Sequence, residues 1–268
     1  VSTGSAKALT CSASTAVLNG SSTTAGVSFS WTGPGIVSGS STATPTVNAP
    51  GTYTLTVTNP VNGCTASASV AVTLDTTPPH ASAGADKLLT CTLTTAVLDG
   101  ASTTVGATFN WTGPDGFSSS ATKPTVTLPG IYLLTVTGPN GCTNADTVEV
   151  IAGTTLPHVS AGSDKVIGCA ETGVVLDGSS TTPGVAYRWT GPNGFISDQP
   201  QPVVTVPGEY TLEVLLPATG CRATDTVAVT AETKLDGVAI AASGPTSFCA
   251  GGFVILTAQP ADAAGYLW

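Results

Sequence analysis

Tryptophan and cysteine recur along the chain at a nearly constant interval, and this repeat constrains the fold more than any other sequence feature. Trp31, Trp111 and Trp189 stand 80 and 78 residues apart. The cysteines follow the same spacing in two series, Cys11, Cys91, Cys169 and Cys249 in the first and Cys64, Cys142 and Cys221 in the second. Self-similarity at a fixed period indicates a tandem array of one structural unit.

Short words around these landmarks repeat in the same register. Trp-Thr-Gly-Pro begins at each of the three tryptophans, and Pro-Gly-x-Tyr recurs at 50–53, 129–132 and 207–210. We therefore predict three complete modules and a partial fourth, at residues 1–78, 79–156, 157–236 and 237–268. Because the fourth copy stops at Trp268, we expect the chain to be a segment of a longer array.

Composition and side-chain alternation predict short β-strands throughout. Glycine and proline are frequent, at 31 and 19 residues, and residues that favour helix interiors are scarce. Tyr132–Thr137 alternates strictly, with Tyr132, Leu134 and Val136 on one face. About seven such strands in roughly 80 residues, separated by turn signals, are typical of an antiparallel β-sandwich. The predicted fold class is all-β, as tandem Ig-like β-sandwich modules.

Each module carries one tryptophan and one tyrosine at positions that suit a sandwich core. The tryptophan stands where a sandwich buries its central indole, and the tyrosine opens the penultimate strand, where a tyrosine corner forms. The expected core aromatic residues are Trp31, Trp111, Trp189, Tyr53, Tyr132 and Tyr210. The alternative is that the tryptophans are platforms for stacking sugars, which their apolar, alternating neighbours disfavour.

Charge and composition exclude several classes of function. The formal net charge of -9 disfavours binding to nucleic acid and to anionic membranes, since both need clustered basic residues. No apolar run reaches the length of a membrane-spanning helix. His80 and His158 occupy the same linker position in two modules, so they do not form an acid–base pair. We expect no enzymatic activity; a pH-sensitive or metal-binding hinge is the alternative to plain linker histidines.

Three carboxylates lie near the predicted module junctions, where tandem sandwiches can bind Ca²⁺ through clustered oxygen ligands. They are Asp75, Asp86 and Asp164. The alternative interpretation makes Asp86 and Asp164 turn residues that pair with their neighbours Lys87 and Lys165. Because no Asp-x-Asp cluster occurs, we expect no cofactor, with Ca²⁺ at the junctions as the alternative.

Several words of the second module resemble a known repeat family. They are Ala-Gly-Ala-Asp-Lys at 83–87, Tyr-x-Leu-x-Val-Thr at 132–137, Asn-Gly-Cys-Thr at 140–143 and Asp-Thr-Val-x-Val at 146–150. Over nearly its whole length the chain is similar to the PKD-like or Ig-like repeats of giant SprB-type surface adhesins, from gliding bacteria that use type IX secretion. It departs from polycystin-type PKD domains, where Trp-Asp-Phe-Gly-Asp-Gly replaces Trp-Thr-Gly-Pro.

This resemblance implies secretion, extracellular display at the cell surface, and partners that are other copies of the chain or surface ligands. It also implies O-glycan attachment, because three sites resemble the Asp-Ser/Thr-apolar acceptor word of that bacterial group. The candidate acceptors are Thr76, Thr147 and Thr226. The alternative is that these threonines only serve strand propensity on outward polar faces.

The sequence therefore predicts a non-enzymatic extracellular repeat array that forms a stalk or filament of a bacterial cell-surface adhesin. Pro-rich joints at 76–79 and 155–157 would set its stiffness. The alternative is a set of modules that bind glycan or protein through loops at the sandwich ends. The Trp-Thr-Gly-Pro loops are nearly identical between copies, which favours a spacer over a site tuned to a ligand.

All seven cysteines are expected to form disulfides, as is usual in small secreted domains. Pairing within modules would join Cys11–Cys64, Cys91–Cys142 and Cys169–Cys221 and leave Cys249 waiting for a partner. Pairing between neighbouring modules would join Cys11–Cys142 and Cys91–Cys221. In an Ig-like strand order the two cysteines of a module lie at opposite ends, which favours the second scheme. We predict pairing within modules, because the first strand can lie beside the last.

Overall fold

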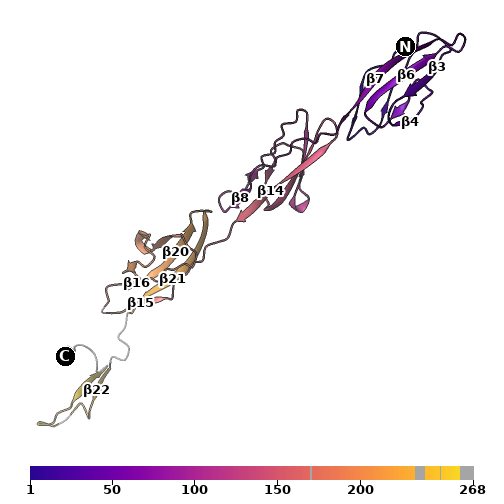
Figure 1. The fold of residues 1–268 in the computed structure, drawn as a ribbon. Helices are drawn as coiled ribbons and strands as arrows, with labels where there is room; N and C mark the ends of the chain where they lie inside the picture. The colour runs from indigo at the N-terminus through magenta and orange to yellow at the C-terminus, as the bar shows by residue number, and fades with distance from the viewer. Residues whose placement is uncertain (170, 233–238, 248, 260–268) are drawn as a thin grey trace. The chain divides into compact units, whose positions relative to one another are not determined.

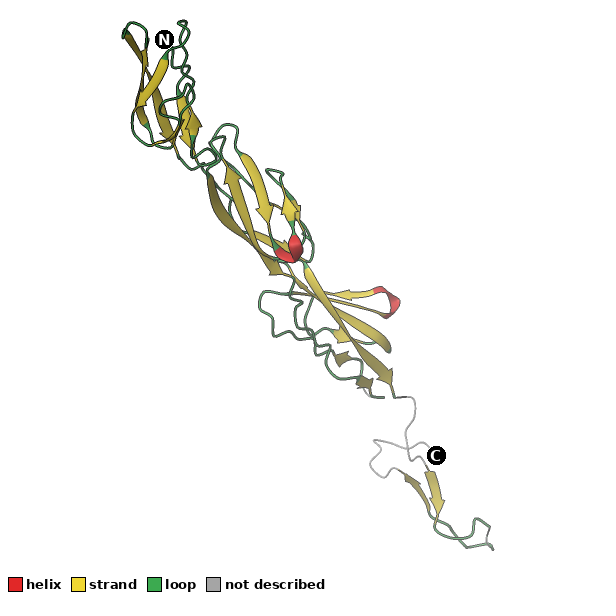
Figure 2. Ribbon diagram, turned by 90° about the vertical axis from the view of Figure 1, so that its right-hand side faces the viewer, coloured by secondary structure: helices red, strands yellow, loops and turns green. Residues whose placement is uncertain are grey.

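The computed structural model describes residues 1–169, 171–232, 239–247 and 249–259, and its regular structure is almost entirely β-strand (Figure 1). Within this described part, two short 3-10 turns, η1 (Pro114–Gly116) and η2 (Pro192–Gly194), are the only helical segments (Figure 2). The all-β prediction is confirmed. The fourth landmark tryptophan, Trp268, lies outside the described residues.

The first sandwich consists of two sheets. Its strands are β1 (Lys7–Thr10), β2 (Ala16–Val17), β3 (Ser28–Thr32), β4 (Ile36–Ser38), β5 (Thr46–Val47), β6 (Gly51–Thr58) and β7 (Thr65–Asp75). The larger sheet has the order β1-β7-β6-β3, and the smaller sheet has the order β2-β5-β4. β1 runs parallel to β7, whereas the other neighbours are antiparallel. This is an Ig-like arrangement.

The second sandwich repeats this topology with one difference: its fourth strand, β11, pairs with β10 in the larger sheet, whereas β4 belongs to the smaller sheet of the first sandwich. Its strands are β8 (Lys87–Thr90), β9 (Ala96–Val97), β10 (Thr108–Thr112), β11 (Ser118–Ser119), β12 (Thr125–Val126), β13 (Gly130–Thr137) and β14 (Thr143–Gly153). The larger sheet has the order β11-β10-β13-β14-β8, with β8 parallel to β14, and β12 pairs with β9.

The third sandwich has the same strand order as the second. Its strands are β15 (Lys165–Ile167), β16 (Val174–Val175), β17 (Ala186–Gly191), β18 (Phe195–Ser197), β19 (Val203–Val204), β20 (Gly208–Leu216) and β21 (Cys221–Ala231). The larger sheet is β15-β21-β20-β17-β18, and β16 pairs with β19. An antiparallel pair, β22 (Ala239–Ala242) and β23 (Leu256–Gln259), follows in the chain.

The chain divides into two compact units, Val1–Gly153 and Thr154–Trp268. Among the described residues the first unit holds two separate hydrophobic cores and the second unit holds one. Alternation along the strands builds these cores: Tyr132, Leu134 and Val136 of β13 are buried, because every second side chain points inward.

Close packing inside each sandwich explains the repeated words. In the first Trp-Thr-Gly-Pro word, a Cβ added to Gly33 would lie 2.5 Å from the ring of Tyr53. Gly51 of Pro-Gly-x-Tyr has a φ of 148°, and a Cβ there would lie 2.7 Å from Cγ of Pro34. A Cβ added to the corresponding glycines of the second and third sandwiches would come similarly close to the tyrosine or the proline of that sandwich. The words recur because each copy needs the same contacts around its tyrosine.

Candidate functional site

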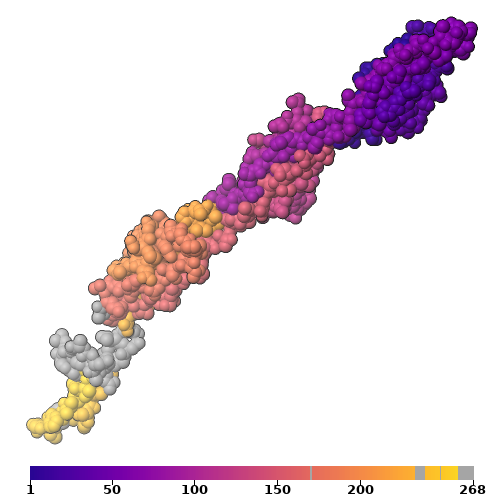
Figure 3. Space-filling view, viewed as in Figure 1, coloured from indigo at the N-terminus to yellow at the C-terminus, as the bar shows by residue number. Residues whose placement is uncertain are grey.

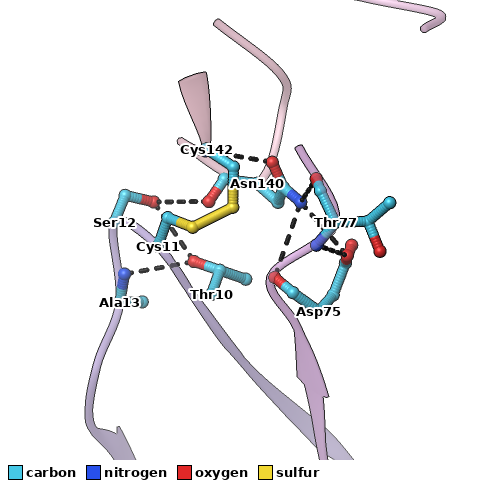
Figure 4. The surroundings of a disulfide bond; sticks show 8 residues. All are labelled: Thr10, Cys11, Ser12, Ala13, Asp75, Thr77, Asn140 and Cys142. Atoms are coloured by element: carbon cyan, nitrogen blue, oxygen red, sulfur yellow. Dashed lines mark hydrogen bonds between the residues drawn. A yellow bond between two sulfur atoms is a disulfide. The ribbon is translucent and has the colours of Figure 1, made fainter. Parts of the chain in front are cut away.

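A disulfide between Cys11 and Cys142 joins the first sandwich to the second (Figure 4). Cys11 follows β1 and Cys142 precedes β14. Their sulfurs are 2.01 Å apart, their Cα atoms are 5.0 Å apart, and 131 residues separate them in sequence. Cys142 is buried, with 3% of its surface exposed. We call this bond the staple.

The predicted pairing within modules is wrong for the first two modules. The first strand does lie beside the last, but in parallel, so that Thr10 faces Asp75 at one end of β7. Cys64 precedes the opposite end of this 11-residue strand, and roughly 3.3 Å per residue puts about 35 Å between the two ends. A disulfide needs Cα atoms within about 7 Å. Cys11 and Cys64 therefore cannot meet.

The other cysteines also depart from that scheme. Cys64, Cys169 and Cys249 carry free, exposed thiols, so the predicted pair Cys169–Cys221 does not form. The pair Cys91–Cys142 is excluded because Cys142 is bonded to Cys11. Cys91 and Cys221 are disulfide-bonded.

The turn after β1 presents Cys11 to the second sandwich. Thr10 N donates to Ala13 O at 2.9 Å, and Ala13 N donates back to Thr10 Oγ1 at 3.1 Å. Between them, the N–H and the hydroxyl of Ser12 both donate to Asn140 O at 3.3 Å. The turn is therefore fixed internally and hydrogen-bonded to the neighbouring sandwich. We call the Thr10–Ala13 turn, together with Asp75 at the end of β7, the turn end of the first sandwich.

Asn140 uses both polar atoms of its side-chain amide, and the nitrogen links the two sandwiches (Figure 4). Its Oδ1 accepts a hydrogen bond from Cys142 N at 3.1 Å, within its own loop. Its Nδ2 donates to Thr77 O at 2.9 Å and to Asp75 Oδ1 at 3.1 Å, both on the first sandwich. The hydrogen bond from Asn140, helped by one from Thr77 N, holds the pKa of Asp75 below its ordinary value.

Glycine at position 141 allows the two sandwiches to approach each other closely. Gly141 has a φ of 77°, and a Cβ there would lie 2.4 Å from Ser12 Cβ. Nearby, Asn144 Nδ2 donates to Pro79 O at 3.1 Å. The space-filling view shows the atoms of the two sandwiches in contact along this part of the first unit (Figure 3). We call residues 138–142 the hairpin end of the second sandwich.

The linker histidines contact their sandwiches through the backbone. His80 N donates to Thr104 Oγ1 at 3.1 Å, and His158 N donates to Thr182 Oγ1 at 2.9 Å. Both histidine side chains are exposed. These contacts fix where the linker enters each sandwich and leave the imidazoles outside the hydrogen bonding.

The carboxylates considered for Ca²⁺ accept hydrogen bonds from N–H groups. Asp86 Oδ1 accepts from Glu149 N at 2.9 Å. Its predicted pairing with Lys87 is wrong, because the ammonium group of Lys87 reaches across to Asp99. The third sandwich repeats both contacts, Asp164 with Ala228 N and Lys165 with Asp177. Across the described ranges, no three His, Cys, Asp or Glu residues gather as a metal site.

The six aromatic residues singled out in the sequence all lie in the cores. They are Trp31, Trp111, Trp189, Tyr53, Tyr132 and Tyr210. Each tyrosine hydroxyl donates to the carbonyl four residues earlier, on Ala49, Leu128 and Val206. Burial raises the pKa of all three tyrosines. The three buried indoles offer no flat face to a sugar.

The candidate O-glycan acceptors Thr76, Thr147 and Thr226 are all exposed. The aspartate before Thr147 has a structural role, because Asp146 Oδ2 accepts a hydrogen bond from Ala83 N at 2.8 Å. Asp225 repeats this contact with Ala161 N at 2.7 Å. The Asp-Thr-Val word is therefore explained by hydrogen bonding within two of the sandwiches.

Ser12, Asn140 and Gly141 belong to the junction, and the sequence analysis did not single them out. Their signal was the Asn-Gly-Cys word, which occurs at 62–64 and at 140–142. In the sequence, that word contributes only to the family resemblance. No helix among the described residues has the length and apolar character needed to span a membrane.

No protein-family model and no curated protein matches the sequence. Solved structures that match include Sidekick-1 immunoglobulin domains 1–5, at 14% identity and a TM-score of 0.34, covering 87% of this chain and 58% of that chain. Drosophila OTK extracellular domains 3–5 match at 11% identity and a TM-score of 0.34, covering 85% of this chain and 94% of that chain.

Three N-terminal domains of the bacteriophage RB49 outer capsid protein Hoc match at 10% identity and a TM-score of 0.39. They cover 85% of this chain and 96% of that chain. Scores this low carry no argument about function. The Ig-like assignment rests on the strand order of the three sandwiches.

Proposed function

We propose that the chain belongs to an extracellular, non-enzymatic repeat array that serves as a stalk or filament of a bacterial cell-surface adhesin. The staple carries this proposal, because it joins two neighbouring sandwiches instead of closing one. A covalent bond at this position restricts bending at the junction and passes tension from one sandwich to the next. Those are the properties that a stalk requires.

Several further observations support the proposal. Disulfides persist in oxidising compartments, which favours an extracellular location. Three separate cores support modules at 1–78, 79–156 and 157–236, with 237–268 as a further partial copy. The bacterial surface, and other copies or surface ligands as partners, follow from the resemblance to adhesin repeats. O-glycans on the exposed threonines would add a solvated coat.

The alternative, binding of glycan or protein through the end loops, finds less support. The Trp-Thr-Gly-Pro loops pack against the tyrosines of their own sandwiches, so their uniform sequence is explained without a ligand. A glycan array probed with the intact chain tests this alternative. Reproducible, saturable binding to one glycan class would favour a binding module over a stalk.

Pulling single chains from their termini tests the stalk directly, in a Cys91→Ser/Cys221→Ser background in which the staple is the disulfide that remains among the described cysteines. The staple encloses 131 residues, which cannot extend while the disulfide is intact. Reduction should therefore lengthen the fully unfolded chain by about 430–470 Å, from roughly 3.3–3.6 Å per residue. The double variant Cys11→Ser/Cys142→Ser is the control and should reach the longer extension without reductant. An oxidised parent that already extends fully would contradict a stapled stalk.

A further inference from the structure

The third sandwich carries charged side chains on the outward side of its larger sheet. Trp189 of β17 is buried, so its exposed neighbour Arg188 points away from the core. By the same alternation, Glu213 points outward between the buried Leu212 and Val214 of β20. The register places Arg188 directly opposite Glu213, so the two side chains are neighbours on this outward side.

Two further charges extend this pair across the sheet. Arg222 of β21 lies on one side, and its Nη1 donates to Glu213 Oε1 at 2.6 Å. Asp198 lies on the other side, directly after β18, where the register of β17 with β18 brings it beside Arg188. A depression of about 540 Å³ lies among them, and Leu215 also lines it. In order across the sheet the residues are Asp198, Arg188, Glu213 and Arg222, with alternating negative and positive charge. We call these four residues the charged face.

The charged face is specific to the third sandwich. Arg188 and Arg222 are the only arginines of the chain. At the positions of the two arginines and Glu213, the strand registers of the other two sandwiches place uncharged residues. These residues are Ser30, Thr56 and Thr65 in the first sandwich and Asn110, Thr135 and Thr143 in the second. The other copies fold without these charges, so their presence in one copy indicates a role outside folding.

Part of this charge has no partner in the described chain. Among the described residues, none forms an ion pair with Arg188 or Asp198, whereas Arg222 is paired with Glu213. The hydrogen bond from Arg222 goes to Oε1, so Oε2 of Glu213 can accept from a further donor. The charged face can therefore form additional ion pairs with groups of both signs.

The charged face lies on the side of its sandwich, where a neighbouring module does not cover it. The second sandwich shows this, because the first sandwich is bonded to its hairpin end. Nevertheless, Asn110 and Thr143, the counterparts of Arg188 and Arg222, are exposed there. Modules that follow one another in an array meet at their ends. A partner for the charged face must therefore approach from the side.

We propose that the charged face is a lateral docking site for the same face of a second copy of this chain. A row of four alternating charges is complementary to itself when one copy is turned about a two-fold axis that runs along the strands between the two faces. Asp198 then faces Arg222 of the second copy, and Arg188 faces Glu213 of the second copy. Each contact occurs twice because the interface is isologous. In this arrangement the two third sandwiches point in the same direction.

Charge balance favours a second copy over a simple ion or a highly charged polymer. Two arginines and two carboxylates cancel, so the charged face has no net attraction for either sign. A partner must present both signs in the reverse order, and the face itself does so. Ala186 and Leu215, which line the depression, add apolar contact. The inference deepens the proposed stalk or filament and rests on it, because lateral pairing of copies is a step from a stalk to a filament.

Sedimentation equilibrium of the whole chain tests the proposal. Cys64, Cys169 and Cys249 are changed to serine so that their free thiols cannot join copies. The parent should form dimers, and their dissociation constant should rise several-fold from about 0.05 M to about 0.5 M sodium chloride, because exposed charge pairs are screened by salt. Asn110→Glu, at the position of Arg188 on the second sandwich, is the matched control and should leave dimerisation unchanged.

Two charge-reversed variants sharpen the test. Arg188→Glu/Arg222→Glu makes the charged face wholly acidic, and Asp198→Lys/Glu213→Lys makes it wholly basic. Each variant should be monomeric alone, because like charges then face one another. An equimolar mixture of the two should form a heterodimer. Formation of that heterodimer also shows that both variants are folded.

Three results would overturn the docking site. They are a parent that remains monomeric at about 1 mM, variants that dimerise alone as the parent does, and a mixture that stays monomeric although both variants melt like the parent. Pulling of single chains involves no second copy, so its outcome bears on the stalk alone. A monomeric parent whose extension is limited by the staple would reject the docking site and keep the stalk.

Discussion

The hairpin ends of the first two sandwiches, residues 59–64 and 138–142, have loops with the same internal hydrogen bond. They differ in what they contact. At the second, Asn140, Gly141 and Cys142 contact or bond the turn end of the first sandwich. At the first, Cys64 is free although its loop has the same internal hydrogen bond from the cysteine N–H to the asparagine. The loop therefore forms without a partner. Docking onto such a preorganised loop costs little backbone entropy.

The cysteines of these two loops differ in the same way. Cys142 is buried under the docked turn, whereas Cys64, at the same position of the repeat, is exposed. Burial of this cysteine is thus a consequence of the junction. Each prediction below tests whether the two loops differ through docking alone.

Removal of the staple should have the largest effect. The double variant Cys11→Ser/Cys142→Ser releases a closed segment of 131 residues, and the chain-entropy model puts the loss at about 5 kcal/mol when both sandwiches unfold together. Denaturant unfolding of the oxidised parent and the variant measures this loss. The matched change Cys64→Ser should alter stability by less than about 0.5 kcal/mol, because that thiol is exposed and unbonded.

In a Cys91→Ser/Cys221→Ser background, which removes the other disulfide bonding, the reduced parent provides a further control, since it should unfold like the double variant. A double variant as stable as the oxidised parent would mean that the staple does not restrict the unfolded chain.

Removal of the tryptophan from the core of the second sandwich should have the next largest effect on stability. Trp111 is fully buried, and its replacement by alanine should destabilise the second sandwich by about 3–5 kcal/mol. The control is Val105→Ala, at a side chain that is 91% exposed, which should change little. Because the cores are separate, the first sandwich should keep its stability, and the Asn62 loop should remain folded.

Urea unfolding of the Trp111→Ala variant, monitored through residue-specific amide signals, measures the transition of each sandwich separately. An unchanged transition for the second sandwich would place the indole on the surface and would support the alternative that the tryptophans stack on sugars. Simultaneous loss of both sandwiches would show that the loops do not form independently.

Replacement of each loop glycine by alanine should distinguish the effect of docking on stability from the effect of backbone strain. Gly63→Ala and Gly141→Ala carry the same cost of positive φ, since the angles are 71° and 77°. At Gly141 the new Cβ also lies 2.4 Å from Ser12 Cβ, whereas at Gly63 it meets nothing within 4 Å. Gly141→Ala should therefore lose about 1–3 kcal/mol more in denaturant unfolding. Equal losses would mean that Ser12 gives way at no cost.

Much of the fold follows from sequence periodicity. Alternation in segments such as 132–137 predicts which side chains are buried, and the repeat register predicts that each copy has its own tryptophan and tyrosine. Alternation does not predict which strand lies beside which, or in which direction. For that reason the parallel pairing of β1 with β7 could not be predicted from the sequence. The predicted disulfides within modules were wrong because a parallel first strand places the two cysteines of a module at opposite ends.

The junction was harder to predict than the core. Asn140 and Ser12 are short polar residues in loops, where such residues are common for local reasons. Only their contact across more than 100 residues of chain gives them a role. The lysine pairs show the same difficulty, because Lys87 pairs with Asp99 rather than with its sequence neighbour Asp86.

The smallest expected effect concerns the ionisation of Asp75, whose carboxylate accepts a hydrogen bond from Asn140. The hydrogen bond from Asn140 lowers the pKa of Asp75 below the ordinary value of 3.8. A carboxyl whose pKa is lower in the folded state stabilises that state above its unfolded pKa, and this contribution disappears as the pH falls through the folded value. Acidification should therefore loosen the junction only below about pH 4.

The side-chain amides of Asn140 and Asn62 provide the matched readout in a two-dimensional NMR titration. The Asn140 signal should shift with a midpoint below 3.8, because its Nδ2 donates to Asp75 Oδ1 at 3.1 Å. The Asn62 signal should not follow this midpoint, since no described carboxylate contacts it. Asp75→Asn should remove the Asn140 titration and leave Asn62 unaffected. If both amides titrated together, the two loops would share an environment, and the difference between an engaged and an open hairpin end would have no basis in solution.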